Sequence, residues 1–393
     1  MTIEKKKTIL WVIDSLSCGG AERSFVSILN LIDISNYNID VLLLKRGGVF
    51  EAYLPDGINL ISPTGFLGDM SYKAIFKRLS LSQIISRIKL SSQVRKQKGK
   101  IHGAEVLWNS INKCVDKERK HYDIAIAYQQ GFPTYFVAEK ISATKKIAWI
   151  NADIDNAGYK PEFNKKFYKQ FNNIIAVSDS LKLKLSKNYP EFTEKFVTVY
   201  DMLNPKLIQK MSLDKGFNDN YAGLRILTIG RMVEQKGYDI AINTALLLKN
   251  AGYSFRWYAI GDGPKMKEMQ KLVSDLDLEN EFVLLGLKPN PYSFIRESDL
   301  YVQTSKSEGF GLTVSEAKIL HKPIVSTNFS SVFNQISDGK NGLIVEMNSK
   351  AVFEGIKNLI ENFELRSYLI SNTECEENTT AITELLKVKE LID

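Results

Sequence analysis

The sequence contains little cysteine and histidine and no long apolar run. Its 393 residues include 3 cysteines, which are odd in number and far apart: Cys18, Cys114 and Cys375. This excludes a disulfide framework and a cysteine-rich metal site. The three histidines are not spaced as a metal-binding pair, so we expect no zinc site: His102, His121 and His321.

The amino-terminal stretch does not resemble a signal peptide. MTIEKKK leads into TILWVI, an apolar run that is too short to span a bilayer and is typical of a buried first strand. The few dispersed cysteines suit a reducing compartment. We therefore expect a cytoplasmic protein, with a peripheral position on the inner face of the cell membrane as a further hypothesis.

Acidic residues are absent between Ser71 and Ala104, although the net charge is only +7. This stretch contains nine basic residues: Lys73, Lys77, Arg78, Arg87, Lys89, Arg95, Lys96, Lys98 and Lys100. Apolar residues recur among them at helical spacing: Leu81, Ile84, Ile85 and Ile88. The pattern predicts a basic amphipathic helix on an anionic membrane surface. A solvated helix packed by one face is the alternative, and the lack of regularly interleaved aromatic residues disfavours nucleic acid.

Apolar runs rich in Ile and Val alternate with amphipathic helical segments along the whole chain. This is the pattern of parallel sheets with helices on both faces. With 44% hydrophobic and 25% charged residues, the chain is long enough for two cores. We predict an α/β protein of two Rossmann-like domains. Because ligands bind at the carboxyl ends of such strands, we expect the two parallel sheets to face a central cleft.

The alternation lapses in the polar stretch NPKLIQKMSLDKGFNDNYAG and restarts at LRILTIG. We therefore place an amino-terminal domain at residues 1–203, a linker at 204–223 and a second domain at 224–375. Residues 376–393 are expected to form a helix that packs back towards the first domain.

The segment Ser307–Glu316 reads as a strand end, a glycine turn and a helix start. Gly309 and Gly311 have no side chains, so backbone N–H groups at the helix start can approach a phosphate or a sugar hydroxyl closely. Glu308 lies in the loop and Glu316 is expected about two turns into the helix, with the carboxylates roughly 10 Å apart. That spacing suits two hydroxyl-bearing sugars of one ligand. The alternative is a pair of solvated helix-end charges.

The segment Gly230–Gly237, GRMVEQKG, follows the strand LRILTIG and precedes a helix. It places Arg231 and Lys236 at the mouth of the sheet. A diphosphate gains negative charge as its bond to a sugar breaks, and fixed cations stabilise that charge. Taken alone, the two residues are equally consistent with solvated surface charges.

These motifs together resemble the retaining glycosyltransferases of family 4, which have the GT-B architecture. The resemblance rests on GRMVEQKG, on IGDGP ending at Pro264, on EGFGLTVSE and on CGGAERS near the amino terminus. The resemblance is specific over roughly residues 224–346, and CGGAERS extends it in a less specific form to the first domain.

The resemblance implies a nucleotide-diphospho-sugar donor. Arg231 and Lys236 would then bind the diphosphate, Glu308 and the backbone of Gly309–Gly311 the sugar, and Glu316 the ribose. The donor-binding residues expected in the second domain are Gly309, Phe310, Gly311, Leu312, Thr313 and Glu316. In such enzymes the donor phosphate helps to deprotonate the acceptor on the face from which it departs, so the anomeric configuration is retained. The resemblance implies no cofactor and no metal.

The first domain contributes fewer candidates. Gly19 and Gly20 follow the first strand and open a helix, so their backbone is expected to approach the donor; a routine strand-to-helix turn is the alternative. Asn151 stands where relatives often have a histidine, and it can hydrogen-bond a sugar hydroxyl but cannot shuttle a proton. Asn151 and Asp153 are expected on the acceptor side. Asp153 and Asp155 have the spacing of metal-binding carboxylates, but such pairs are common by chance.

We therefore expect an enzyme that transfers a hexose from a nucleotide sugar to a glycan acceptor, lipid-linked and used in cell-surface polysaccharide synthesis. The alternative is a non-catalytic GT-B-like subunit that binds a glycosyltransferase or a glycan. A Rossmann oxidoreductase is disfavoured, because the G-x-G-x-x-G fingerprint is missing after the first strand.

Overall fold

The computed structural model describes residues 6–17, 19–68, 102–152, 154, 157–374 and 377–393. They form two compact units, one of Met1–Asp201 with Leu385–Asp393 and the other of Met202–Glu384. The predicted membrane-binding segment, residues 72–100, lies outside the described residues, as does Asp153.

The first unit contains a parallel sheet of seven strands in the order β3-β2-β1-β4-β5-β6-β7. The strands are β1 Lys7–Ile13, β2 Tyr37–Leu43, β3 Asn59–Ile61, β4 His121–Ala127, β5 Ser142–Ile150, β6 Asn173–Ala176 and β7 Phe196–Thr198. The α-helices are α1 Gly20–Leu31, α2 Gly65–Gly68, α5 Gly103–Ile111, α6 Phe132–Lys140, α7 Pro161–Tyr168 and α8 Asp179–Asn188. Short 3-10 helices are η1 Ile34–Asn36, η2 Val49–Tyr53 and η3 Pro190–Lys195.

Aromatic side chains fill the centre of the first unit. Trp11 on β1 and Trp149 on β5 are almost fully buried, with their ring centroids 6.2 Å apart. Tyr128 packs against both rings, and Phe25 of α1 closes the cluster. Because the central strands are covered on both faces, their sequences read as continuous apolar runs.

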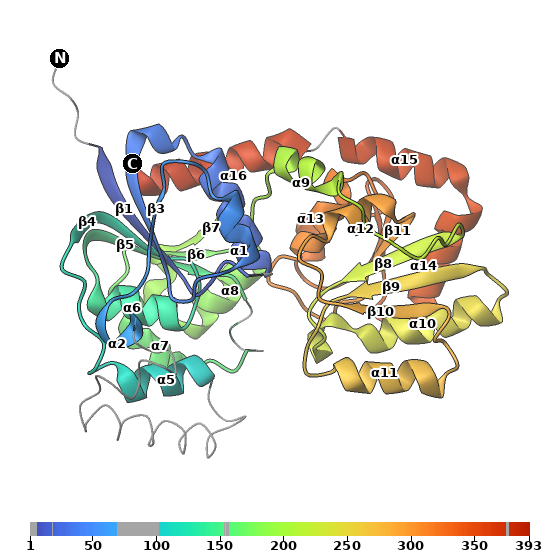
Figure 1. Ribbon diagram of the computed structural model, residues 1–393, viewed down its shortest axis with the longest axis horizontal. Coiled ribbons are helices and arrows are strands. Elements are labelled where there is room, and N and C mark those ends of the chain that lie inside the picture. The colour runs from blue at the N-terminus through green and yellow to red at the C-terminus, as the bar shows by residue number, and fades with distance from the viewer. Residues whose placement is uncertain (1–5, 18, 69–101, 153, 155–156, 375–376) are drawn as a thin grey trace. The chain divides into compact units, whose positions relative to one another are not determined.

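The second unit contains a parallel sheet of six strands in the order β10-β9-β8-β11-β12-β13 (Figure 1). The strands are β8 Leu224–Ile229, β9 Phe255–Ile260, β10 Phe282–Gly286, β11 Leu300–Gln303, β12 Ile324–Thr327 and β13 Leu343–Val345. The helices are α9 Pro205–Ser212, α10 Tyr238–Asn250, α11 Met266–Asp275, α12 Tyr292–Glu297, α13 Leu312–Ile319, α14 Ser349–Glu361, α15 Phe363–Glu374 and α16 Glu377–Ile392, with η4 Glu234–Lys236 and η5 Val332–Asn334. The fold class predicted from the sequence is confirmed: both units have a Rossmann-like parallel sheet.

The sequence predicts a linker at residues 204–223. In the structure this segment packs within the second unit. It begins with α9, and the N–H groups of Gly216 and Phe217 donate to the carboxylate of Glu297 at 3.0 and 2.9 Å. Asp219 forms ion pairs with Arg225 and Arg256, each at 3.0 Å. After α9 the segment is irregular, but Gly216, Phe217 and Asp219 have partners on α12 and on the sheet.

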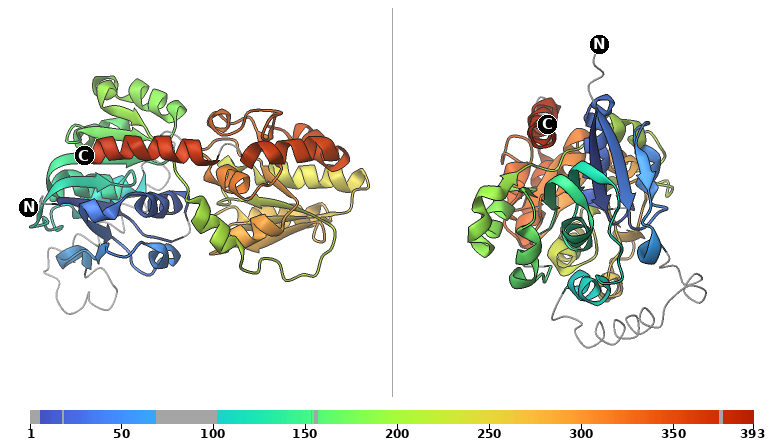
Figure 2. Two further views of the ribbon diagram at one scale, coloured as in Figure 1. Left: turned by 90° about the horizontal axis from the view of Figure 1, so that it is seen from above. Right: turned by 90° about the vertical axis from the view of Figure 1, so that its left-hand side faces the viewer.

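The last part of α16 belongs to the first unit (Figure 2). Val388 and Ile392 are buried there. The Lys387 ammonium lies 5.5 Å from the centroid of the Tyr200 ring. No helix within the described ranges combines the length and the hydropathy of a membrane-spanning segment.

Candidate donor-binding site

Two loops meet at the carboxyl edge of the second sheet. β8 leads into the loop Gly230–Gly237, and β11 leads through Glu308 into α13. Since β8 and β11 are adjacent and parallel, both loops emerge at the same edge, which is where ligands of such sheets bind. Lys236 Nζ lies 2.5 Å from Glu308 Oε1. Two predicted site residues that are far apart in the sequence are therefore brought into contact.

The Glu308 carboxylate is held mainly through one oxygen. Oε1 accepts hydrogen bonds from Lys236 Nζ at 2.5 Å, Gln303 Nε2 at 2.9 Å and Ser305 Oγ at 2.5 Å. The side chains of Glu308 and Lys236 are 11% and 19% exposed, so this is a partly buried ion pair in which hydrogen bonds compensate for lost solvation. Oε2 forms no hydrogen bond with a residue in the described part of the chain.

Gly237 allows the loop after β8 to turn into α10. It adopts the left-handed conformation with φ of 62°, and a Cβ atom there would lie 2.0 Å from the carbonyl oxygen of Thr304. Thr304 Oγ1 donates to the carbonyl oxygen of Lys236 at 3.1 Å. A larger residue at Gly237 would therefore push the Lys236 loop away from the Glu308 loop.

The IGDGP loop after β9 packs against the same region. A Cβ atom on Gly261 would lie 1.8 Å from the carbonyl oxygen of Gly230. That oxygen accepts a hydrogen bond from the Tyr238 hydroxyl at 2.6 Å. Burial, and next the negative charge of Glu308, raise the pKa of Tyr238 well above its usual range, so the hydroxyl stays a donor. The glycines of this motif thus allow close contact between loops.

Arg231 lies apart from this pair. Its side chain is exposed, and among the described residues its guanidinium has no hydrogen-bond or ion-pair partner. It is therefore available to an anion at the edge of the sheet, which is the position that the sequence predicted.

The glycine turn after Glu308 is fixed from behind. Ser331 Oγ donates to the carbonyl oxygens of Glu308 and Phe310 at 3.2 and 3.1 Å, and Gln335 Nε2 donates to the Phe310 oxygen at 2.5 Å. Gly311 has φ of 100° and precedes α13 with no side-chain cap. The N–H groups at this helix start therefore remain suited to bind an anion or a hydroxyl.

The other residues of this motif are largely buried. The side chains of Phe310 and Leu312 are each 6% exposed, so they anchor the turn in the core and leave ligand contact to the backbone. Thr313 Oγ1 donates to Gln303 Oε1 at 3.1 Å. Thr313 is therefore linked to Glu308 through Gln303.

Glu316 lies deeper than the sequence suggested. α13 begins at Leu312, so Glu316 lies about one turn into the helix, and the expected two turns were wrong. Its side chain is fully buried, and Oε1 accepts a hydrogen bond from the Tyr292 hydroxyl at 3.2 Å. A ribose can therefore contact Glu316 only if the groups that cover its carboxylate move.

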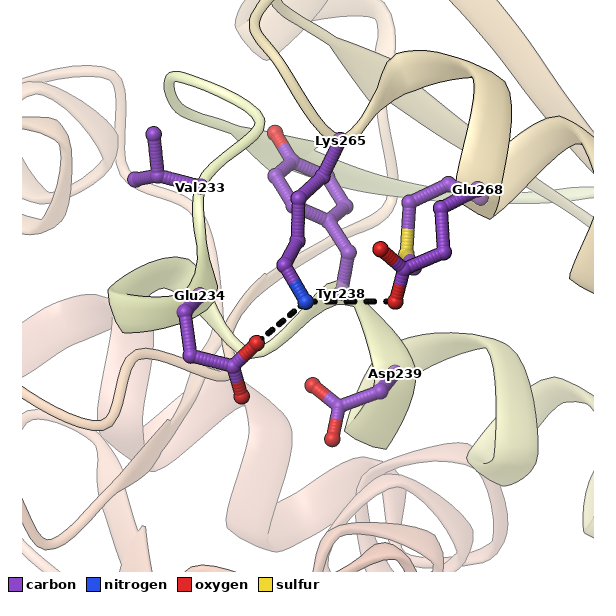
Figure 3. Close-up of a pocket in the computed structure, with 7 residues that line it drawn as sticks. Val233, Glu234, Tyr238, Asp239, Lys265 and Glu268 are labelled. Carbon is purple, nitrogen blue, oxygen red and sulfur yellow. Dashed lines mark hydrogen bonds and ion pairs between the residues drawn. The ribbon is translucent and has the colours of Figure 1, made fainter. Parts of the chain in front are cut away.

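A separate pocket of about 120 Å³ lies between the start of α10 and α11 (Figure 3). Lys265 pairs there with Glu234 and, at 3.1 Å, with Glu268. Glu234 also pairs with Lys306 at 2.5 Å. None of the catalytic residues proposed from the sequence lines this pocket. Its charges instead connect the loops that follow β8, β9 and β11.

The first-unit candidates lie at the edge of their own sheet. Gly19 is the N-cap of α1, which begins at Gly20. Asn151 follows β5, and its N–H donates to Gln130 Oε1 at 3.0 Å. Both polar atoms of the Asn151 side chain are buried and have no hydrogen-bond partner among the described residues. A buried amide without hydrogen bonds is destabilising. A polar ligand that reached Asn151 would supply the missing hydrogen bonds.

The residues that support Glu308 were not predicted from the sequence. Gln303, Ser305, Ser331 and Gln335 all bond to its carboxylate or to the turn that follows it. A polar residue at the end of the buried strand DLYVQT was the available signal for Gln303. Within the described ranges, no three His, Cys, Asp or Glu side chains are grouped to hold a metal ion.

Solved structures with this fold include Anabaena HepE in complex with UDP-glucose. The match has a TM-score of 0.69 at 17% identity and covers 98% of this chain and 99% of the HepE chain. TarM also has a TM-score of 0.69, at 15% identity, with both chains covered in full. These likenesses show the fold alone, which is the GT-B architecture of two parallel-sheet units.

Sequence comparison identifies the second unit more closely. Residues 215–375 match the family described as glycosyl transferases group 1, so this part of the chain is similar to that family. An uncharacterized glycosyltransferase of Methanocaldococcus jannaschii, MJ1178, is 29% identical over 264 residues, which cover 66% of this chain and 69% of the relative.

Two bacterial relatives have more specific names. CapM, a capsular polysaccharide biosynthesis glycosyltransferase of Staphylococcus aureus, is 28% identical over 51% of this chain and 55% of the relative. An N-acetylgalactosamine-N,N'-diacetylbacillosaminyl-diphospho-undecaprenol 4-alpha-N-acetylgalactosaminyltransferase of Campylobacter jejuni is 27% identical over 46% of this chain and 49% of the relative. The matched part therefore spans about half the length of these two relatives.

Proposed function

We propose that this chain is a retaining hexosyltransferase that moves a sugar from a nucleotide-diphospho-sugar to a glycan acceptor. The observation that carries the proposal is the contact between Lys236 and Glu308 at 2.5 Å. A cation and a hydroxyl-binding carboxylate are thus placed side by side at the edge where a parallel sheet binds its ligand.

In this proposal the diphosphate binds to Arg231 and Lys236. Arg231 is exposed and has no partner in the described part of the chain, and Lys236 is fixed by Glu308. As the bond to the sugar breaks, negative charge grows on the diphosphate, and preorganised cations stabilise it without reorganising. The two side chains supply the positive charge, so the proposal needs no metal and no cofactor.

The sugar in turn binds to Glu308 and to the backbone of the turn Gly309–Gly311. The N–H groups at the start of α13 and the open Oε2 of Glu308 match the donors and acceptors of hydroxyl groups. Glu316 is assigned to the ribose. With the donor held in this way, its phosphate accepts the acceptor's proton on the face of departure, and no protein nucleophile is required.

The proposed acceptor is lipid-linked and serves cell-surface polysaccharide synthesis. The names of CapM and of the Campylobacter diphospho-undecaprenol enzyme support this assignment. The nine basic residues between Ser71 and Ala104 support binding to the anionic inner face of the cell membrane. Asn151, whose buried amide has no partner among the described residues, and Asp153 are assigned to the acceptor side.

The test is a panel of UDP-, GDP- and dTDP-sugars. A ligand that binds only the folded state raises the melting temperature, and hydrolysis of the bound donor releases its nucleoside diphosphate. We expect at least one member of the panel to stabilise the protein and to be hydrolysed. Stabilisation by none would indicate a non-catalytic GT-B-like subunit.

A further inference from the structure

Gln303 is the last residue of β11 and is 1% exposed. Its side-chain amide has all its hydrogen-bonding capacity filled. Oε1 accepts from the Tyr301 hydroxyl at 2.5 Å and from Thr313 Oγ1 at 3.1 Å, while Nε2 donates to Ser305 Oγ at 2.6 Å and to Glu308 Oε1 at 2.9 Å. A buried amide saturated in this way is fixed in position.

Only one orientation of the amide fits this arrangement. If the amide were reversed, its carbonyl oxygen would face the carboxylate of Glu308, and two acceptors would oppose each other. The hydroxyl groups of Tyr301 and Thr313 tolerate either orientation, because each can donate or accept. Burial raises the pKa of Tyr301 well above its usual range, so its hydroxyl remains a donor to Gln303.

The bonds to Glu308 are unequally shared between its two oxygens. Gln303, Ser305 and Lys236 all donate to Oε1, and Oε2 has no partner within the described residues. The three donors hold Oε1 in place and leave Oε2 available to a ligand.

We propose that Gln303 is a positioning residue that holds Oε1 of Glu308 and so presents Oε2 to a hydroxyl group of the transferred sugar. This inference rests on the proposed function. Tyr301 and Thr313 orient the amide, and the network runs from the interior of the sheet to the site. Fixing a charged group before the ligand arrives removes the cost of ordering it on binding.

The test compares Gln303→Met with Thr244→Val. Methionine is close to glutamine in size but cannot hold the carboxylate. Thr244 is a fully buried residue on α10 whose hydroxyl donates to the carbonyl oxygens of Ile240 and Ser349, so its variant controls for general destabilisation. Calorimetry measures the affinity for UDP and UDP-glucose, with GDP and GDP-mannose or dTDP and dTDP-glucose used if wild type prefers those pairs.

Gln303→Met is expected to weaken binding of the nucleotide sugar about tenfold or more, the scale of a hydrogen bond to a charged group. Binding of the nucleoside diphosphate should change less than about threefold, because Glu308 is assigned to the sugar. Thr244→Val should leave the ratio of the two affinities unchanged. An equal loss of both affinities in Gln303→Met would overturn the positioning role.

A crystal structure of Gln303→Met separates this inference from the proposed function. We expect the Glu308 carboxylate to rotate away from Ser305, and an unmoved carboxylate would overturn the inference whatever the protein binds. If the wild-type protein binds none of the nucleoside diphosphates or nucleotide sugars, the proposed function is wrong, and the proposed sugar contact is wrong with it. If Gln303→Met does not fold, Tyr301→Phe takes its place, with a smaller selective loss expected and an unselective one contradicting the proposal.

Discussion

Lys236 and Glu308 form an ion pair at the edge of the second sheet, and both side chains are largely buried. We expect Lys236→Ala and Glu308→Gln each to lower turnover by about 100-fold or more, which is the scale of losing a main electrostatic contact in the transition state. The measurement is steady-state release of nucleoside diphosphate, with circular dichroism to verify folding.

Lys249→Ala provides the matched control for these variants. Lys249 is a lysine of the same unit that pairs with Glu281 at 3.3 Å, away from the site, and its variant should retain turnover. Near-normal turnover in correctly folded Lys236→Ala would contradict the diphosphate role of Lys236.

Gly237 is constrained both by its left-handed backbone conformation and by the close carbonyl oxygen of Thr304. Its φ is 62°, and an added Cβ atom would meet the Thr304 carbonyl oxygen, whereas at Gly252, with φ of 82°, nothing lies within 4 Å. Gly252→Ala should therefore cost only the left-handed strain, about 1 kcal/mol. Gly237→Ala should cost more and should also weaken nucleotide-sugar binding, because Lys236 is its neighbour.

Thermal unfolding and calorimetry of both glycine variants check this prediction. Equal losses of stability, with ligand binding intact in Gly237→Ala, would show that the close approach of the two loops has no role in the site.

Among the contacts between elements, Asp219 links the segment before β8 to the sheet through its ion pairs with Arg225 and Arg256. Its burial alone would raise the pKa, but hydrogen bonds from Tyr258, the Tyr221 N–H, Arg225 and Arg256 outweigh this and lower it from 3.8 to about 2. A carboxyl group with a lowered pKa stabilises the folded state above its unfolded pKa, and the stabilisation is lost as the pH falls through the folded value.

Asp219→Asn should therefore cost on the order of 1 kcal/mol near pH 7, because solvent screens much of the attraction at this exposed carboxylate. The difference from wild type should stay constant down to about pH 5 and shrink between about pH 4 and pH 2. Urea unfolding across this range measures it, with the exposed Asp275→Asn as control. A difference that does not depend on pH would show that the ion pairs of Asp219 contribute nothing.

The alternation of strands and helices could be predicted from the sequence because buried parallel strands require continuous apolar runs. The packing of residues 204–223 could not be predicted in this way. The Pro, Asn, Asp and Gly residues of this segment are typical of a linker, and yet Glu297 accepts hydrogen bonds from Gly216 and Phe217. Irregular backbone carries no periodicity, so its packing depends on partners that are distant in the sequence.

For the whole molecule, the proposed chemistry predicts that activity survives EDTA. Arg231 and Lys236 are assigned the charge that a divalent metal would otherwise supply. Donor hydrolysis should keep its rate after chelation. Complete loss, restored by manganese, would instead assign a metal role to Asp153 and Asp155.

Binding to anionic lipid is predicted for residues 72–100. At about 1 kcal/mol per basic residue near an anionic surface, a few engaged side chains suffice, and the apolar face of the predicted helix adds burial. Cosedimentation with anionic vesicles should occur at low salt and weaken as salt screens the charges. Changing Arg87, Lys89, Arg95 and Lys96 to Gln should release the protein and leave donor hydrolysis unchanged; wild type that does not cosediment contradicts the prediction.

The sequence by itself determined the fold class and the position of the candidate site. Apolar runs define the strands, and Arg231, Lys236 and Glu308 follow two of them, so their place at a sheet edge could be predicted from strand order alone. The glycines of GRMVEQKG and EGFGLTVSE also mark turns, and Gly237 and Gly311 have positive φ, which disfavours a side chain there.

Only the tertiary structure decided how these residues act on one another. Lys236 and Glu308 become partners because β8 and β11 are neighbours in the sheet. Gln303 reaches Glu308 because both flank the end of β11, and its amide is fixed by Thr313 from the helix beyond. Glu316 is fully buried, and its partner is the Tyr292 hydroxyl of α12, which no local pattern predicts. Local patterns specify where each element begins, but hydrogen bonds between elements depend on packing, which arises only when the whole sheet has formed.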